Sequence, residues 1–133
     1  MIDYQKDLQI ENIQDDLTNL ASLYSFYHSK MMEYKEGYDQ AKRNLDSLSA
    51  IKYLTYRHSY EDEGKKFTEK VLESLVTSDD EVIRARTHLD DKYNEYYLYR
   101  GVVESLSVKK DALVQLSANN RAEIQLHNST PRN

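Results

Sequence analysis

An apolar seam runs along the N-terminal half of the chain, with steps of four and three residues that alternate without a break. The seam residues are Ile13, Leu17, Leu20, Tyr24, Tyr27, Met31, Tyr34, Tyr38, Ala41, Leu45 and Leu48. This spacing is the heptad pattern of a long helix that packs against another helix. The next seam position is Lys52, so we expect the apolar stripe to stop there, while the helix itself covers about residues 12–57.

A second long helix is predicted over about residues 79–125. One stripe of this helix, more polar than the first seam, comprises Leu89, Tyr93, Tyr96, Tyr99 or Arg100, Val103, Leu106, Lys110, Leu113, Leu116 and Ile124. Ser78 and Glu81 have the spacing of a capping box, in which the Ser78 hydroxyl accepts a hydrogen bond from the Glu81 amide. We therefore expect the helix to begin with the acidic residues that follow Ser78.

The segment between the two long helices contains a loop and a short helix. Residues 58–66 are polar and include Gly64, which favours a loop. Residues 67–76 are predicted to form the short helix. The apolar face of this helix comprises Phe67, Val71, Leu72 and Leu75.

The length of the first helix has a consequence for the fold. It would be roughly 70 Å long at ~1.5 Å per residue, which is more than a lone globule of 133 residues requires. We therefore predict an all-α fold, with two long antiparallel helices joined by the short helix, that assembles into a helical homo-oligomer. Residues 1–127 are expected to form a single helical domain, and residues 128–133, which hold the only proline, a disordered tail.

The composition excludes several classes of protein. With 3 Gly and 1 Pro the chain has few places for tight turns, which argues against an all-β fold. Without cysteine it has no disulfide, no cysteine-based zinc site and no thiol nucleophile. The N-terminal residues lack the pattern of a signal peptide, and no stretch approaches the ~18 apolar residues of a membrane span, so we expect neither.

The net charge of −5 argues against a protein whose whole surface coats nucleic acid, but the charge is unevenly placed. Residues 1–29 carry 5 acidic side chains against 1 basic side chain. Residues 41–60 carry four basic side chains against Asp46 alone. A nucleic-acid site is therefore expected in this central window or beside it.

Basic and aromatic residues near this window are the candidate binding groups. The candidates for phosphate contacts are Lys52, Arg57, Lys42, Arg43, Lys65, Lys66 and Lys70. The chain has 12 tyrosines, most of them on the predicted seams, where packing explains them. Tyr53 and Tyr56 instead stand beside basic residues and are candidates for base stacking. Acidic residues interleave with the basic run, so a solvated helix face is the competing interpretation.

No feature of the sequence indicates catalysis. The four histidines are scattered, and none has the spacing of a metal-ligand pair. No phosphate-binding loop, nucleophile elbow or other catalytic motif occurs. We therefore expect no catalytic residues, no metal and no cofactor.

Four stretches of the chain carry a further signal. They are LTNLASLYSFYHSKMMEY (17–34), LSAIKYLTY (48–56), KVLESLVTSDDEVIRARTHLDDKY (70–93) and KKDALVQLSANNRAEI (109–124). Their order and spacing, over most of the chain, resemble the phage recombination mediator proteins of the UvsY type.

The resemblance implies a helical protein that assembles into rings, heptameric in the best-known case, in the cytoplasm of the infected bacterium. Such mediators bind single-stranded DNA and help to load a RecA-like recombinase onto strands covered by single-strand-binding protein. The family's DNA contacts centre on basic residues just before a tyrosine element, which places Lys52 on such a position and Arg57 just beyond it. The chain departs from the family pattern at Ala50, where a second basic residue is expected, and at Thr55, where the family has tyrosine.

Two functions are consistent with these patterns. The leading hypothesis is a non-enzymatic recombination mediator that binds single-stranded DNA. The alternative is a structural or adaptor helical-hairpin protein with no nucleic-acid role, because a heptad seam alone supports it equally well.

Overall fold

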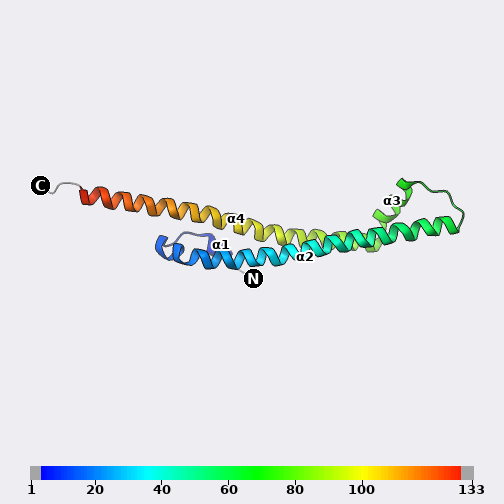
Figure 1. Cartoon of the computed structure of the whole chain (residues 1–133), viewed down its shortest axis with the longest axis horizontal. Coiled ribbons are helices and arrows are strands. Elements are labelled where there is room, and N and C mark those ends of the chain that lie inside the picture. The colour runs from blue at the N-terminus through cyan, green and yellow to red at the C-terminus, as the bar shows by residue number, and fades with distance from the viewer. Residues whose placement is uncertain (1–3, 130–133) are drawn as a thin grey trace. The chain divides into compact units, whose positions relative to one another are not determined.

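A computed structural model describes residues 4–129 of the chain, and within this range all regular structure is helical (Figure 1). The helices are α1 (Tyr4–Leu8), α2 (Ile13–Asp62), α3 (Glu69–Ser78) and α4 (Asp80–Ser129). The two long helices, α2 and α4, contain 50 residues each and pack against each other. The predicted all-α fold with two long antiparallel helices and a short connecting helix is confirmed.

Contacts divide the chain into two units, and both long helices contribute to each of them. Unit 1 consists of the described parts of residues 1–31 and 98–133, and unit 2 of Met32–Tyr97. In the part of the chain that the structure describes, no helix combines the length and apolar character needed to cross a membrane.

Unit 1 has an apolar core along the seam between α2 and α4. Its buried residues are Leu20, Tyr27, Val102, Val103 and Leu106. The ring of Tyr27 lies beside that of Tyr99, with centroids 6.5 Å apart, whereas Asp16 lies beside Lys109. Lower numbers on α2 therefore meet higher numbers on α4, which is the antiparallel arrangement.

Helix α1, which was not predicted, covers one flank of this core. Tyr4 and Leu8 pack against the buried residues, and the Tyr27 hydroxyl donates a hydrogen bond to Oδ2 of Asp7 at 2.6 Å. The buried Lys109 donates from Nζ to the backbone carbonyl of Asp7 at 2.7 Å and lies 3.7 Å from the Asp16 carboxylate. Because a buried ammonium needs such partners, α1 and the start of α2 are held against α4.

The lysine in the α4 seam was predicted wrongly. Lys110, assigned to the stripe, is exposed, and Lys109 is the buried one. The heptad spacing admits either position, because each of them lies three or four residues from both Leu106 and Leu113. The polar partners that α1 supplies decide which lysine is buried.

Unit 2 combines an aromatic cluster with the cover that α3 supplies. The ring of Tyr38 on α2 contacts those of Tyr93 and Tyr96 on α4, with centroids 5.5 and 6.1 Å apart. Leu72 of α3 and Val82 of α4 are completely buried. The apolar face of α3 therefore supplies the cover that the two long helices cannot provide alone.

The first helix ends later than predicted, at Asp62 rather than near residue 57. Gly64 has a φ of 67°, its amide donates to the Glu61 carbonyl at 3.1 Å, and the Lys65 amide donates to the Tyr60 carbonyl at 2.9 Å. These two bonds form a Schellman motif, which requires a left-handed residue that glycine adopts without strain. Gly64 therefore sets the end of α2.

Helix α3 begins later than predicted and covers Glu69–Ser78 rather than residues 67–76. Its N-cap residue is Thr68, whose side chain accepts a hydrogen bond from the Val71 amide at 3.3 Å.

The capping box predicted before α4 is wrong. The Ser78 hydroxyl donates to the Ser74 carbonyl at 2.7 Å. The cap is instead Asp79, whose carboxylate is a stronger acceptor for helix amides.

At its other end, α4 continues to Ser129, past the predicted end at residue 125. Residues 128 and 129, assigned to a disordered tail, are therefore helical. The remaining residues of that tail, 130–133, lie outside the described range.

We expect Leu106→Ala to lower the free energy of unfolding by about 2–5 kcal/mol, because it leaves a cavity in the core of unit 1. Urea unfolding followed by circular dichroism, at a fixed protein concentration, measures this change. The matched control is Val108→Ala, since Val108 lies two residues along α4 and is 67% exposed. A control that unfolds as easily as Leu106→Ala would contradict this account of the core.

Candidate nucleic-acid interface

The predicted binding residues all lie in unit 2, on the second half of α2, the following loop and the start of α3. The structure does not gather them into one patch. Six of the nine make ion pairs or side-chain hydrogen bonds, and the other three make none within residues 4–129. Which cations are free to meet a phosphate therefore depends on these contacts.

Lys52 and Tyr56 belong to a polar cluster centred on Asp79. The Lys52 ammonium lies 3.4 Å from the Asp79 carboxylate and 3.3 Å from that of Glu81. The Tyr56 hydroxyl donates to Oδ2 of Asp79 at 2.6 Å. The other carboxylate oxygen, Oδ1, accepts the backbone amides of Glu81 at 2.9 Å and of Val82 at 3.2 Å, and so caps α4. One side chain thus fastens the start of α4 to α2.

The titration of this cluster reflects its contacts. The hydrogen bond from Tyr56 lowers the pKa of Asp79; the amides of Val82 and Glu81 and the charge of Lys52 act in the same direction, against partial burial. The same hydrogen bond raises the pKa of Tyr56. Partial burial acts to lower the pKa of Lys52, but the contacts with Glu81 and Asp79 outweigh it and raise that pKa overall. Each shift favours the charged Lys52, the charged Asp79 and the neutral Tyr56.

Tyr53 and Arg57 are also engaged by carboxylates. The Tyr53 hydroxyl donates to Oε2 of Glu69, and this bond is the main reason that the pKa of Tyr53 is raised. The Arg57 guanidinium pairs with Glu61 one turn along α2, at 3.0 Å. A base or a phosphate would have to displace these partners.

Arg43 and Lys65 make exposed contacts. Arg43 lies 3.4 Å from Glu36 and donates to the side-chain oxygen of Gln40 at 2.8 Å. The Lys65 ammonium lies 2.7 Å from Glu63. Because such surface pairs contribute little energy, a phosphate could compete for these two cations more easily than for Lys52.

Lys42, Lys66 and Lys70 are exposed, and none of them makes an ion pair within residues 4–129. Lys66 lies in the loop before α3, and Lys70 lies four residues later in the first turn of α3. Lys42 lies on the outer surface of α2. Of the nine predicted residues, these three are the ones whose charge no carboxylate of the described chain neutralises.

Two tyrosines on α4 that were not predicted to bind are exposed. Tyr93 is 42% exposed and Tyr97 is 59% exposed, and their rings stack with centroids 5.8 Å apart. Tyr93 therefore lies at the margin of the predicted stripe, since its ring contacts that of Tyr38 on α2 but is largely open to solvent. The heptad pattern indicates this exposure, because Tyr93 lies one residue after the seam position that Lys92 occupies.

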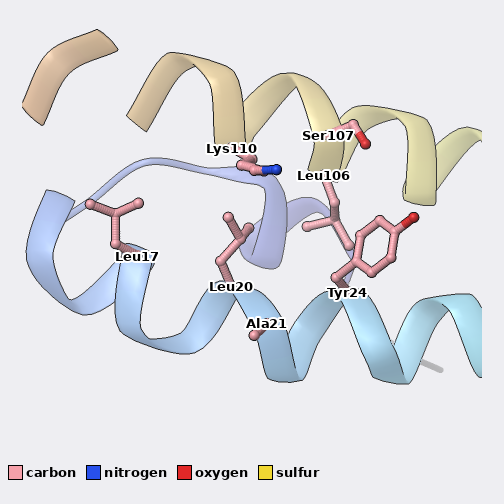
Figure 2. Close-up of a pocket in the computed structure, with 7 residues that line it drawn as sticks. All are labelled: Leu17, Leu20, Ala21, Tyr24, Leu106, Ser107 and Lys110. Atoms are coloured by element: carbon pink, nitrogen blue, oxygen red, sulfur yellow. The ribbon is translucent and has the colours of Figure 1, made fainter. Parts of the chain in front are cut away.

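Unit 1 contains an apolar groove between α2 and α4, with a volume of about 540 Å³ (Figure 2). Leu17, Leu20 and Tyr24 extend from α2 toward α4, and Leu106 extends from α4 between them. Lys110 of α4 also lines the groove. Such a lining can receive an apolar side chain, but it offers no nucleophile paired with a base. Within the described range, no cluster of three or more potential metal ligands occurs.

We expect Asp79→Asn to lower the melting temperature at neutral pH, because the neutral amide keeps the shape but loses the charge that holds Lys52 and Tyr56. The folded-state pKa of Asp79 lies below its unfolded value, so its contribution to stability is present above about pH 4 and is lost as the pH falls through the folded-state pKa. The difference between wild type and variant should therefore narrow in acid.

Thermal melts followed by circular dichroism across this pH range test the prediction. Asp91→Asn, on the exposed surface of α4, is the matched control and should change the melting temperature little. A difference between wild type and Asp79→Asn that stayed constant with pH would show that the charge of Asp79 does not act as described.

Comparison with known proteins does not assign the chain to a family. No protein-family model matches the chain, and no curated protein or solved structure shows significant similarity to it. The likeness to UvsY-type mediators therefore stays a prediction that rests on the four sequence stretches.

Proposed function

We propose that this chain is a non-enzymatic recombination mediator that acts in the cytoplasm of a phage-infected bacterium. It binds single-stranded DNA and promotes the loading of a RecA-like recombinase onto strands covered by single-strand-binding protein. The sequence resemblance supports the biological role. The observation that carries strand binding is the group of exposed lysines in unit 2 without a carboxylate partner: Lys42, Lys66 and Lys70.

Unpaired cations are the better phosphate ligands for a physical reason. A lysine that already pairs with a carboxylate must give up that contact when it binds a phosphate. A solvated lysine gains the contact while the strand releases its condensed counterions, which is the main driving force for such binding. Lys66 and Lys70 therefore contribute more to binding than Lys52, although the resemblance places Lys52 at a DNA-binding position.

One copy of the chain would bind weakly, because it is acidic overall, with a net charge of −5. A homo-oligomer repeats the lysines along the strand, and linked sites can raise affinity by about 10²–10⁴-fold without new contacts. Repeated contacts of this kind would hold an extended strand, weaken the grip of the covering protein and favour nucleation of the recombinase.

The C-terminal part of α4 is the surface we propose for self-association. Asp16 lies beside Lys109, so α2 begins close to the level of Leu113, whereas α4 continues to Ser129 (Figure 1). Beyond Leu113, large apolar side chains are exposed, among them Ile124 at 59%. A second copy that packs along this part of α4 would bury them.

The second candidate function is a structural or adaptor helical hairpin. The observation that favours it is the cluster around Asp79, because Lys52 and Tyr56, at or next to positions that the resemblance links to DNA, are used to hold α2 and α4 together. In that case the exposed lysines would only keep the surface hydrated.

We expect Lys66→Gln combined with Lys70→Gln to weaken binding of a labelled single-stranded oligonucleotide in a fluorescence-anisotropy titration. Wild-type affinity should fall steeply as salt rises. In the double variant the slope of log K against log salt should be smaller by about 1.4, or about 0.7 for each lysine that no longer meets a phosphate.

The control for this experiment is Lys6→Gln combined with Lys110→Gln, which makes the same change of net charge in unit 1. It should leave the salt slope close to that of wild type. Absence of binding by the wild type at low salt would favour the hairpin function. An equal weakening in both double variants would show that only net charge matters and would overturn the assignment of Lys66 and Lys70.

Ile124→Glu should reduce the mass of the assembly measured by native mass spectrometry or light scattering, because it places a charge in the proposed contact between copies. Val108→Glu, at an exposed apolar residue on another face of α4, should leave the mass unchanged. A wild-type chain that is monomeric at all concentrations would count against the mediator function.

A further inference from the structure

One face of unit 2 brings exposed aromatic rings and unpaired cations together. It is formed by Tyr93, Tyr97 and Arg86 on α4 and by Lys35 and Lys42 on α2, and we call it the aromatic face. Apart from Lys42, none of these residues was a binding candidate on sequence grounds. The aromatic face lies outside the cluster around Asp79.

The heptad register places the cations and Tyr93 on the same side of the seam, with Arg86 one heptad before Tyr93. Lys35 and Lys42 each follow a seam residue of α2 by one position, and Tyr93 follows a seam residue of α4 in the same way. In unit 1 the residues at this heptad position, Ala21 and Ser107, line one groove (Figure 2). In an antiparallel pair, this position on both helices therefore flanks the same edge.

The contacts of Tyr38 fix the level of these residues along the two helices. The Tyr38 ring contacts the Tyr93 ring, with centroids 5.5 Å apart. On α2, Lys35 lies about one turn before Tyr38 and Lys42 about one turn after it, so their backbones are about 10 Å apart. The exposed ring of Tyr93 therefore comes level with the segment of α2 between the two lysines.

The aromatic rings pack on the half-buried Tyr38 at one end and are open to solvent at the other. Tyr38 is half-buried and holds one edge of the cluster, Tyr93 packs on it, and Tyr97 stacks on Tyr93 with ring planes inclined by 24°. Tyr97, at the outer end, is 59% exposed. A planar group can therefore stack on Tyr97 without moving the core of unit 2.

The cations around these rings are free of carboxylate partners. Lys35, Lys42 and Arg86 are exposed, and the described chain places no carboxylate within ion-pair distance of any of them. Asp39, Asp46 and Asp90 lie in neighbouring positions of the two helices and reduce the local positive potential. Contact with bases, and not charge alone, must then contribute to affinity at this face.

We propose that the aromatic face binds single-stranded DNA, with bases stacked on Tyr97 and Tyr93 and phosphates against Lys35, Lys42 and Arg86. This inference rests on the proposed function and deepens it, since it names the site at which bases are held. Single strands have unstacked bases that can meet an aromatic ring, whereas the bases of a duplex are already stacked. The aromatic face therefore distinguishes single strands from duplex, which the lysines around α3 cannot do alone.

The test compares Tyr97→Ala with wild type in anisotropy titrations against a labelled oligothymidylate of about 16 nucleotides, at the upper end of common site sizes. A stacking contact is worth about 1–3 kcal/mol per base, so the dissociation constant should rise by about 5- to 150-fold. Tyr97→Phe should bind like wild type, because it keeps the ring. Leu98→Ala, which removes a neighbouring exposed apolar side chain, is the control.

A second probe separates stacking from charge. Against an abasic strand of the same length, wild type and Tyr97→Ala should bind equally, because only phosphates remain. If wild type binds oligothymidylate and Tyr97→Ala binds it equally well, the aromatic face is not the site, although strand binding stands. If wild type binds no single strand at low salt, the proposed function fails and this inference fails with it. Helical content from circular dichroism confirms that each variant is folded.

Discussion

The seam between α2 and α4 is the contact on which the rest of the structure depends. Each long helix buries one stripe against the other, but two helices alone leave both flanks of that stripe open to water. The chain covers one flank in unit 1 with α1 and supplies cover in unit 2 with α3. Both attachments use polar groups at helix ends, through Lys109 with Asp7 and through Asp79 with Lys52 and Tyr56. The flanks that stay open, the apolar groove and the aromatic face, are the places available for partners.

The polar attachments explain why the basic window predicted from sequence is only partly available for binding. Lys52 continues the heptad of α2, so it points toward α4 and must find a carboxylate there; Asp79 and Glu81 supply it. Tyr56 lies one turn further along the same face and meets the same aspartate. Their charge and hydrogen-bonding capacity stabilise the hairpin. Lysines that lie off the seam, such as Lys66 and Lys70, do not point toward α4 and need no carboxylate partner there.

The seam of α2 was predictable because the heptad repeat is long and unbroken. The helix ends were less predictable, since they depend on local competition between acceptors: Asp79 caps α4 in place of Ser78, and Gly64 delays the end of α2. The burial of Lys109 could not be predicted, because its partners come from residues about a hundred positions away. For the same reason, the sequence indicated which residues are basic but not which of them are paired.

Ion pairs therefore decide which of the basic residues in this chain are available to bind a partner. Nearly a third of its residues are charged, at 31%, with 18 basic and 23 acidic side chains, so the number of basic residues alone says little about binding. Pairs at i and i+4, such as Arg57 with Glu61, remove much of the local field. Of the cations left without a carboxylate partner in residues 4–129, two lie beside α3 and three belong to the aromatic face. A strand that contacts both groups would meet phosphate ligands at one and stacking surfaces at the other, which is the combination that single-strand binders use.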